Sequence, residues 1–323
     1  MKKLIKDKQQ FLSDMLEGIK IAHPELEVIN DNVVVKKDKK TTGVTLVSGG
    51  GSGHEPAHAG YVAQGMLDAA VCGEVFTSPT PDKILDAIKA VDTGEGVLLI
   101  VKNYAGDVMN FEMAQEMAEM EGINAAMVVV KDDIAVSDVE QRRGVAGTVF
   151  IHKFAGFLAD KGLSLTEIQA KVEELLPTVK SIGMALTPPM VPTTEKYGFD
   201  IDENDIEIGI GIHGEKGLHR QQMMEPIDQI VTRLGDALLQ EVDSKEILVM
   251  VNGMGGTPLS ELTIATSYIK QYFDAHDITV KYWYVGDYMT SLDMQGFSIT
   301  VVPYSETLLK ALLAPTTSRY FNI

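Results

Sequence analysis

The sequence predicts an α/β protein made of two α/β domains, with mostly parallel or mixed sheets flanked by helices. Helix-like and strand-like segments alternate along most of the 323 residues, a chain longer than most single domains. Several β-type segments are continuous apolar runs, which are typical of parallel strands covered on both faces. The composition, 45% hydrophobic and 23% charged, is that of a globular protein with a sizeable core. We expect an N-terminal domain over 1–184 and a C-terminal domain over 185–323.

In the first part, helices are predicted where apolar residues recur at helical spacing, and strands where β-type residues run together. The expected helices are Phe11–Ala22, Tyr61–Ala70, Lys83–Val91, Phe111–Met120 and Val145–Ala159. The expected strands are Val33–Lys36, Val44–Val47, Val97–Val101 and Ala125–Val130. This strand–helix alternation implies right-handed crossovers between parallel strands.

A change in composition near residue 185 suggests the domain boundary. The segment Thr187–Thr194 holds three prolines, and an acidic stretch follows over 200–207. Beyond it the chain again reads as α/β. The expected strands are Ile206–Ile212, Ile247–Val251, Val280–Val285 and Phe297–Val302, and the expected helices are Glu225–Leu239 and Leu259–Ala275.

The bulk properties exclude several function classes. A formal net charge of −18 argues against broad binding to nucleic acid or to an anionic membrane, because both need a basic face. Cys72 is the only cysteine, which fits a reducing compartment. No apolar run approaches 18 residues, and no signal-peptide core follows Met1. We therefore expect a cytoplasmic protein.

The most informative stretch is 45–58, where a β-type run leads into a glycine-rich segment followed by His54. Such glycines let backbone N–H groups converge on an oxyanion or hydroxyl, and a histidine can transfer protons near neutral pH. The spacing matches neither a dinucleotide fingerprint, nor a phosphate-binding P-loop, nor a nucleophile elbow around Ser52. It predicts another kind of small-molecule site, while a glycine turn with a helix-capping histidine stays open.

Two further loops carry candidate chemistry. Ligands of α/β sheets bind at the carboxyl ends of strands, and the loop Lys102–Asp107 directly follows one apolar run. Asp107 can serve as a general base and Lys102 can bind an oxygen, although the same pair also occurs on solvated loops. His213 lies between two glycines at a strand end, open enough to act as a nucleophile; a turn histidine is the alternative.

No metal site is expected. His54 and His58 are spaced to share a helix face, but this spacing alone does not predict a metal site. His152 falls on the apolar periodicity of its predicted helix and is interpreted as structural.

Six motifs follow one another along the chain: Ser48–Pro56 (SGGGSGHEP), Phe76–Lys83 (FTSPTPDK), Lys102–Asp107 (KNYAGD), Arg142–Thr148 (RRGVAGT), Gly209–Glu215 (GIGIHGE) and Thr290–Thr300 (TSLDMQGFSIT). Together they resemble one family, the dihydroxyacetone kinase substrate-binding subunits linked to the phosphotransferase system. The resemblance runs nearly end to end. It implies a homodimer of two-domain subunits that hold dihydroxyacetone between these loops.

The resemblance also implies a role for each site residue. His213 would bond covalently to the substrate carbonyl as a hemiaminal, His54 would assist as acid and base, and Asp107 would activate the hydroxyl that attacks phosphorus. The substrate-binding residues would be Gly51, Ser52, Gly53, His54, Lys102, Asp107 and His213. One departure is that only three residues separate Asp138 from Arg142, where family members usually have a few more.

Cofactors and partners follow from the same resemblance. Single-chain ATP-dependent members continue into a nucleotide-binding helical domain, whereas this sequence ends at Ile323. The chain is therefore expected to bind no cofactor itself. ADP or ATP and magnesium would belong to a DhaL-type partner subunit, recharged from phosphoenolpyruvate through a DhaM-type donor. The alternative is a sensor that binds dihydroxyacetone without catalysis and co-activates a transcription factor, since such relatives exist.

Overall fold

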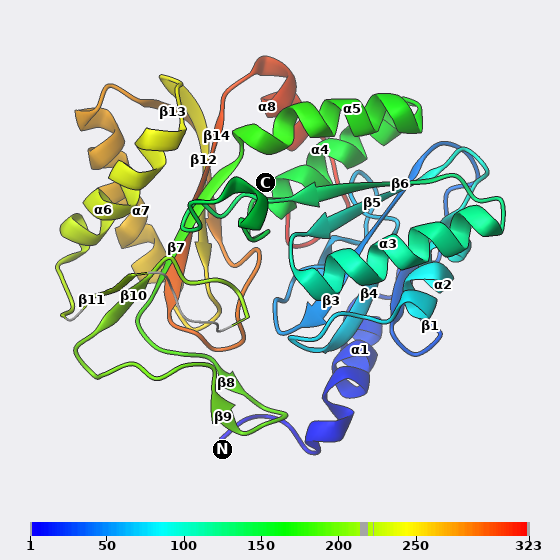
Figure 1. The fold of residues 1–323 in the computed structure, drawn as a ribbon, viewed down its shortest axis with the longest axis horizontal. Coiled ribbons are helices and arrows are strands. Elements are labelled where there is room, and N and C mark those ends of the chain that lie inside the picture. Colours follow the sequence, from blue (N-terminus) through cyan, green and yellow to red (C-terminus); the bar gives the residue numbers. More distant parts are fainter. Residues whose placement is uncertain (1, 214–218, 222, 322–323) are drawn as a thin grey trace.

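The computed structural model describes residues 2–213, 219–221 and 223–321. Within these residues the strands form two six-stranded sheets and a two-stranded ribbon, and helices flank both large sheets (Figure 1). Both sheets are mixed. The predicted fold class is therefore confirmed.

The first sheet has the strand order β1-β2-β4-β3-β5-β6. Neighbours among β4, β3, β5 and β6 are parallel, while β1 and β2 form an antiparallel edge. The strands are β1 (Leu26–Ile29), β2 (Val33–Lys36), β3 (Thr45–Ser52), β4 (Ala69–Val75), β5 (Val97–Lys102) and β6 (Ala125–Val130). Its helices are α1 (Phe11–Ala22), α2 (Pro81–Val91), α3 (Ala105–Met120), α4 (Thr148–Asp160) and α5 (Leu165–Leu175). Apolar residues of α2 and α3 pack on one face, and those of α1, α4 and α5 on the other.

The second sheet has the order β11-β10-β7-β14-β12-β13, and among the described residues only β12 and β13 are parallel neighbours. Its strands are β7 (Lys180–Ala185), β10 (Ile206–Ile208), β11 (His219–Gln221), β12 (Glu246–Gly253), β13 (Thr279–Gly286) and β14 (Gly296–Pro303). Helices α6 (Ile227–Glu241) and α7 (Leu259–Ala275) pack on one face, and α8 (Glu306–Leu312) contacts α4. The ribbon joins β8 (Met190–Val191) to β9 (Lys196–Tyr197). Because β7 belongs to this sheet, the chain passes between the sheets before residue 180; the division at residue 185 stays a prediction.

The segment after the glycine loop differs from the expectation. The helix predicted over Tyr61–Ala70 is wrong: a single 3-10 turn, Ala59–Tyr61, is followed by β4, which starts at Ala69. Strand pairing decides this outcome, because β4 lies between β2 and β3 and is buried on both faces. Gly65, with φ of +77°, adopts a left-handed conformation that a helix cannot contain. The interpretation of His54 and His58 on one helix face is also wrong, because residues 53–58 form bends and turns rather than a helix.

Other boundaries moved by a few residues. The glycine run belongs to β3, which extends to Ser52. Helix α3 starts at Ala105 rather than Phe111, so Asp107 lies in its first turn. The strand expected over Ile206–Ile212 stops at Ile208. These shifts matter because they set where the site side chains emerge.

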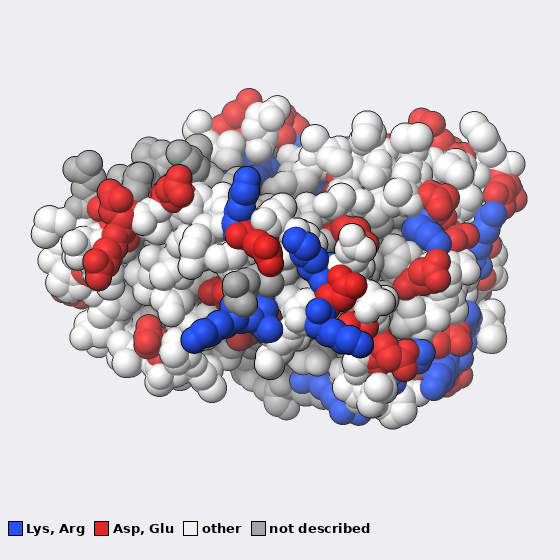
Figure 2. Space-filling view, turned by 90° about the horizontal axis from the view of Figure 1, so that it is seen from below, with Lys and Arg blue, Asp and Glu red and all other residues white. Residues whose placement is uncertain are grey.

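The surface carries both signs of charge. On the face seen from below in Figure 2, lysine and arginine side chains lie next to aspartates and glutamates rather than in one continuous basic area. Among the described residues, no helix is both long and apolar enough to span a membrane.

An ion pair between the buried Arg142 and the partly exposed Glu241 ties the short 138–142 loop to α6. Both Nη atoms of Arg142 donate to the Glu241 carboxylate, at 3.1 and 2.8 Å, and Lys180 Nζ lies 3.1 Å from the same group. Only 4% of the Arg142 side chain is exposed. Hydrogen bonds from Arg142 lower the pKa of Glu241 to about 2. The loop is thus anchored to the second sheet's helical layer.

Glu241→Gln should lower the free energy of unfolding at pH 7 by about 1–3 kcal/mol, because it removes the anion from two cations, one of them buried. The pKa of Glu241 is lower in the folded chain than the usual 4.5. The stabilisation is therefore complete above pH 4.5 and is lost as the pH falls towards 2. Denaturant titrations at several pH values measure this difference. Asp274→Asn, which breaks the exposed pair with Lys270, is the control and should cost less than about 0.5 kcal/mol at any pH. A difference that persists at low pH would contradict this assignment.

Candidate functional site

The site forms at the carboxyl ends of β3 and β5, which are adjacent parallel strands. Strand β3 leads to His54, and β5 ends at Lys102, just before the first turn of α3 with Asp107. Parallel strands end at the same edge of a sheet, so these loops meet. An open cleft of about 720 Å³ lies there. It is lined by Phe76, Thr77, Ser78, Asn103, Tyr104, Ala105, Gly106, Asp107, Asn110, Arg143 and His213.

The glycines of β3 let neighbouring parts of the chain lie close against the strand, and they do not form an open cradle for a ligand. A Cβ on Gly51 would lie 2.5 Å from the backbone nitrogen of Thr77, and a Cβ on Gly50 would collide with Nζ of Lys102. Glycine at both positions lets the 76–78 turn and the lysine lie against the strand. Ser52 Oγ donates to the Gly73 carbonyl at 2.7 Å, and the Gly53 N–H donates to the Glu55 carboxylate at 3.0 Å. These two polar groups are thus engaged within the loop.

His54 is fully buried and held in one tautomer. Its Nδ1 lies 2.8 Å from the Thr290 carbonyl, which can only accept, so Nδ1 carries the proton. Its Nε2 has no hydrogen-bond partner among the described residues and keeps a lone pair. Burial, and then the neighbouring His213 and Lys102, hold the pKa of His54 well below its usual value. At neutral pH this ring is a proton acceptor at Nε2.

His213 stands opposite His54. Its ring lies edge-on to the rings of Tyr104 and His54, with centroids 4.1 and 4.8 Å away, and also edge-on to Phe76. Burial, followed by the charges of Lys102 and Arg143, lowers the pKa of His213 to about 3. The imidazole is therefore neutral at physiological pH, as a nucleophile must be.

Asp107, which lines the cleft, forms a buried ion pair with Lys102. Lys102 Nζ lies 3.2 Å from Asp107 Oδ2, and both side chains are at most 2% exposed. Ser78 Oγ donates to the other carboxylate oxygen. A carboxylate placed in the first turn of α3 is also favoured by the helix dipole. The pair presents an ionised acceptor beside the cleft.

The structure therefore brings together His54, His213, Lys102 and Asp107, from loops up to 159 residues apart in sequence. Of the predicted site residues, Asp107 and His213 line the cleft itself, whereas Gly51, Ser52, Gly53, His54 and Lys102 do not. Gly214 and Glu215 of the predicted histidine motif lie outside the described residues.

The sequence analysis did not identify two aromatic residues that pack against the site histidines, Phe76 and Tyr104. Phe76 stacks on His54 with centroids 5.2 Å apart, and Tyr104 packs against His213. Thr290, which orients His54, comes from the second sheet's side, 236 residues away. The only signal for these residues was their place inside the quoted motifs. Among the described residues, no group of three or more His, Cys, Asp or Glu is arranged to hold a metal ion.

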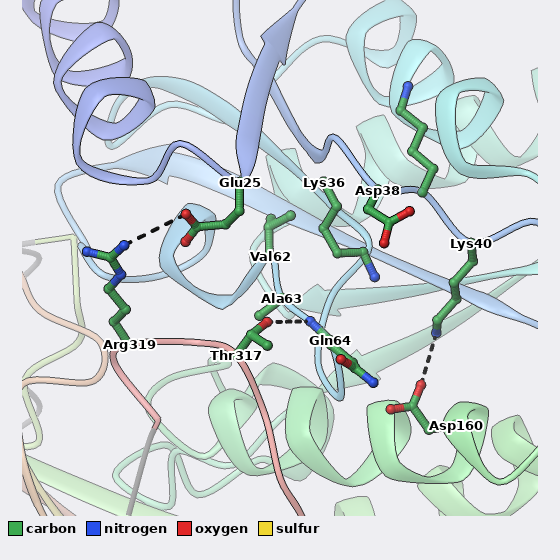
Figure 3. A pocket seen from close by; sticks show the side chains of 11 residues that line it. Glu25, Lys36, Asp38, Lys40, Val62, Ala63, Gln64, Asp160, Thr317 and Arg319 are labelled. Carbon is green, nitrogen blue, oxygen red and sulfur yellow. Dashed lines mark hydrogen bonds and ion pairs between the residues drawn. The ribbon is translucent and has the colours of Figure 1, made fainter.

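A second hollow of about 630 Å³ lies away from these residues (Figure 3). Several of its charged side chains form ion pairs: Lys36 and Lys40 with the nearby Asp68, Lys40 with Asp160, and Arg319 with Glu25. None of the predicted site residues lines it. The strand-end cleft is the better candidate for chemistry.

Comparison with known proteins places this geometry in a family. Residues 17–320 match the family model of the Dak1 domain. The chain is 47% identical over 310 residues to the dihydroxyacetone-binding subunit DhaK of the PTS-dependent dihydroxyacetone kinase 1 of Listeria innocua, which covers 94% of each chain. It is 41% identical to the dihydroxyacetone-binding subunit DhaK of the PEP-dependent kinase of Escherichia coli, covering 100% of this chain and 99% of the other.

Solved structures agree. The dihydroxyacetone kinase of C. freundii matches with a TM-score of 0.93 and 35% identity, over 98% of this chain and 59% of the other. The dihydroxyacetone kinase operon co-activator DhaQ matches with a TM-score of 0.91 and 36% identity, over 96% and 98% of the two chains. On these grounds the chain belongs to the Dak1 domain family.

Proposed function

We propose that this chain is the dihydroxyacetone-binding subunit of a phosphoenolpyruvate-dependent dihydroxyacetone kinase, a phosphotransferase. One observation carries the proposal: a neutral histidine, His213, faces a second neutral histidine, His54, beside the buried carboxylate of Asp107. A substrate that is bound through its carbonyl and phosphorylated on a hydroxyl needs a nucleophile for the carbonyl, a group that carries the proton and a base for the hydroxyl. The names of the relatives aligned over nearly their full length support it.

The first step is formation of a covalent hemiaminal. The lone-pair nitrogen of His213 attacks the ketone carbon, a C–N bond forms, and the carbonyl π electrons move to oxygen. That oxygen takes up a proton while the imidazole loses one from its other nitrogen, so the adduct is neutral. His54 can carry this proton at Nε2, which has no hydrogen-bond partner among the described residues. Glycerol has no carbonyl and cannot react in this way.

The second step is phosphoryl transfer. Asp107 accepts the proton of the substrate's terminal hydroxyl while the hydroxyl oxygen attacks the γ-phosphorus of ATP. The bond between that phosphorus and the ADP leaving group breaks. We assign the nucleotide and magnesium to a DhaL-type partner subunit, recharged from phosphoenolpyruvate through a DhaM-type protein. The relatives' description as dihydroxyacetone-binding subunits supports this division. We further propose that the subunit works as a homodimer in the cytoplasm.

Gly51, Ser52, Gly53 and Lys102 remain proposed substrate-binding residues. In the structure Lys102 Nζ is 3.4 Å from the Gly49 carbonyl, the longest of its contacts, so this donor is the one that can turn to a substrate oxygen. Ser52 and Gly53 can bind the substrate only if the Ser52 hydroxyl gives up its hydrogen bond to the Gly73 carbonyl and the Gly53 N–H gives up its bond to Glu55.

A co-activator role is the second candidate, favoured by the match to DhaQ over almost both chains. The kinase is preferred because identity to named kinase subunits is higher, at 47% against 36%, and because Asp107 lines the cleft and is paired with Lys102.

Phosphoryl transfer measured with the purified chain separates the candidates. We expect dihydroxyacetone phosphate to form when the chain, dihydroxyacetone and a nucleotide-loaded DhaL-type subunit are combined, and not when the partner is replaced by free ATP. Binding of dihydroxyacetone with no product in either mixture would favour the co-activator. Full turnover with free ATP alone would overturn the assignment of the nucleotide to a partner.

A further inference from the structure

Two buried histidines outside the proposed mechanism, His58 and His152, are connected to the Lys102–Asp107 pair by hydrogen bonds. His58 precedes the 3-10 turn after the glycine loop, and His152 lies in the middle of α4. They are 4% and 0% exposed, and His58 Nδ1 is 2.9 Å from His152 Nε2. His58 Nε2 in turn lies 3.3 Å from Lys102 Nζ. The contacts form a continuous line from α4 to the carboxylate of Asp107.

Lys102 has one acceptor for each of its three ammonium protons. These are Asp107 Oδ2 at 3.2 Å, His58 Nε2 at 3.3 Å and the Gly49 carbonyl at 3.4 Å. The lysine is fully buried, so water cannot replace a missing acceptor. A buried ammonium with an unmet donor is costly. The His58 ring therefore helps to decide where the ammonium sits.

The contacts assign one tautomer to each ring. An ammonium can only donate, so His58 Nε2 accepts and His58 Nδ1 carries the proton. That proton points to His152 Nε2, which accepts, so His152 is also protonated at Nδ1. Ser48 Oγ, 3.4 Å from His58 Nδ1, gives its own proton to the Ile100 carbonyl and can only accept from His58.

Both rings must stay neutral for this arrangement. Burial, and then the charge of Lys102, lower the pKa of His58 well below its usual value and that of His152 to about 3. Donation from His58 to His152 also makes the His58 acceptor nitrogen more electron-rich, since hydrogen bonds in a chain polarise one another.

We propose that His58 and His152 are positioning residues, which hold Lys102 as an ammonium directed at Asp107 and so fix the carboxylate that activates the substrate hydroxyl. They touch neither the substrate nor the transferred group. The inference rests on the proposed role of Asp107, and it extends the site inward to α4.

Steady-state kinetics with the loaded partner tests the proposal. His58→Leu removes the acceptor and should lower kcat about 10- to 100-fold, the size expected for one hydrogen bond to a charged group, with little change in KM for dihydroxyacetone. His58→Gln offers an amide oxygen to Lys102 and should recover most of that loss. His23→Leu is the matched control, because His23 is a buried histidine bonded to Glu25 and Tyr320 outside the cleft. It should leave kcat unchanged.

Equal losses in His58→Leu and His58→Gln, or a loss confined to KM, would overturn the proposal. Should His58→Leu fail to fold, nitrogen NMR of the unmodified protein still decides. Both rings should show Nδ1–H tautomers that persist from pH 8 to pH 5. An Nε2–H on either ring would contradict the proposed hydrogen bonds from Lys102 to His58 and from His58 to His152. If the unmodified protein had no kinase activity, the proposed function would be refuted. The NMR result would still test the hydrogen bonds of His58 and His152 separately.

Discussion

Replacing Asp107 by asparagine should leave dihydroxyacetone bound while kcat falls by about 10²–10⁴-fold, the usual contribution of a positioned general base. The amide keeps the shape of the carboxylate: its oxygen can accept from Lys102, and its NH2 group can donate to the Ser78 hydroxyl, the two groups that hold Asp107 in place. It cannot take the proton of the attacking hydroxyl. Binding is measured by calorimetry, and kcat with the loaded partner subunit.

The matched control is Asp82→Asn, because Asp82 occupies the first turn of α2, the neighbouring helix on the same face of the sheet. It does not line the cleft, and kcat should be unchanged. If Asp107→Asn instead abolished binding with little effect on the turnover of bound substrate, Asp107 would be a substrate-positioning residue rather than the base.

His213→Ala should abolish the covalent adduct. In the parent protein, the carbonyl carbon of labelled dihydroxyacetone should move in the 13C spectrum from a ketone signal to that of a tetrahedral carbon. In the variant the ketone signal should remain, because His213 is the only histidine among the described residues that line the cleft. Affinity should fall by at least about tenfold, or 1.4 kcal/mol, and approach that for glycerol.

His276→Ala controls for the loss of an imidazole, since His276 is exposed at the end of α7. It should keep the tetrahedral signal. A tetrahedral signal in His213→Ala, or unchanged discrimination against glycerol, would contradict the covalent role of His213.

Several elements could be predicted because local signals and tertiary packing agree. The helices Phe11–Ala22 and Leu259–Ala275 have the predicted bounds, each with a proline close to one end. The apolar runs Val97–Val101 and Ala125–Val130 are adjacent parallel strands. The segment Tyr61–Ala70 failed because its helical spacing is overridden by pairing of β4 with two neighbours, which no local pattern reports.

The site could be predicted in part for the same reason. The rule that ligands bind at strand ends located the loops of His54 and Asp107, which β3 and β5 bring to one edge. It could not show that His213 stands against His54, since that depends on how the two sheets meet. His152 was interpreted as structural because its periodicity reports burial but not the partner, His58, that it meets 94 residues away.

Single-turnover transfer from the partner's labelled nucleotide tests the central claim most directly. The chain is first saturated with dihydroxyacetone labelled at its carbonyl carbon, then mixed with a stoichiometric amount of loaded partner and quenched over time. We predict that the tetrahedral adduct is present before mixing, and that labelled phosphate appears on dihydroxyacetone in amounts equal to the adduct in the parent protein but not in Asp107→Asn. Transfer at the parental rate in His213→Ala or Asp107→Asn, or an adduct that never yields phosphorylated product, would contradict the account.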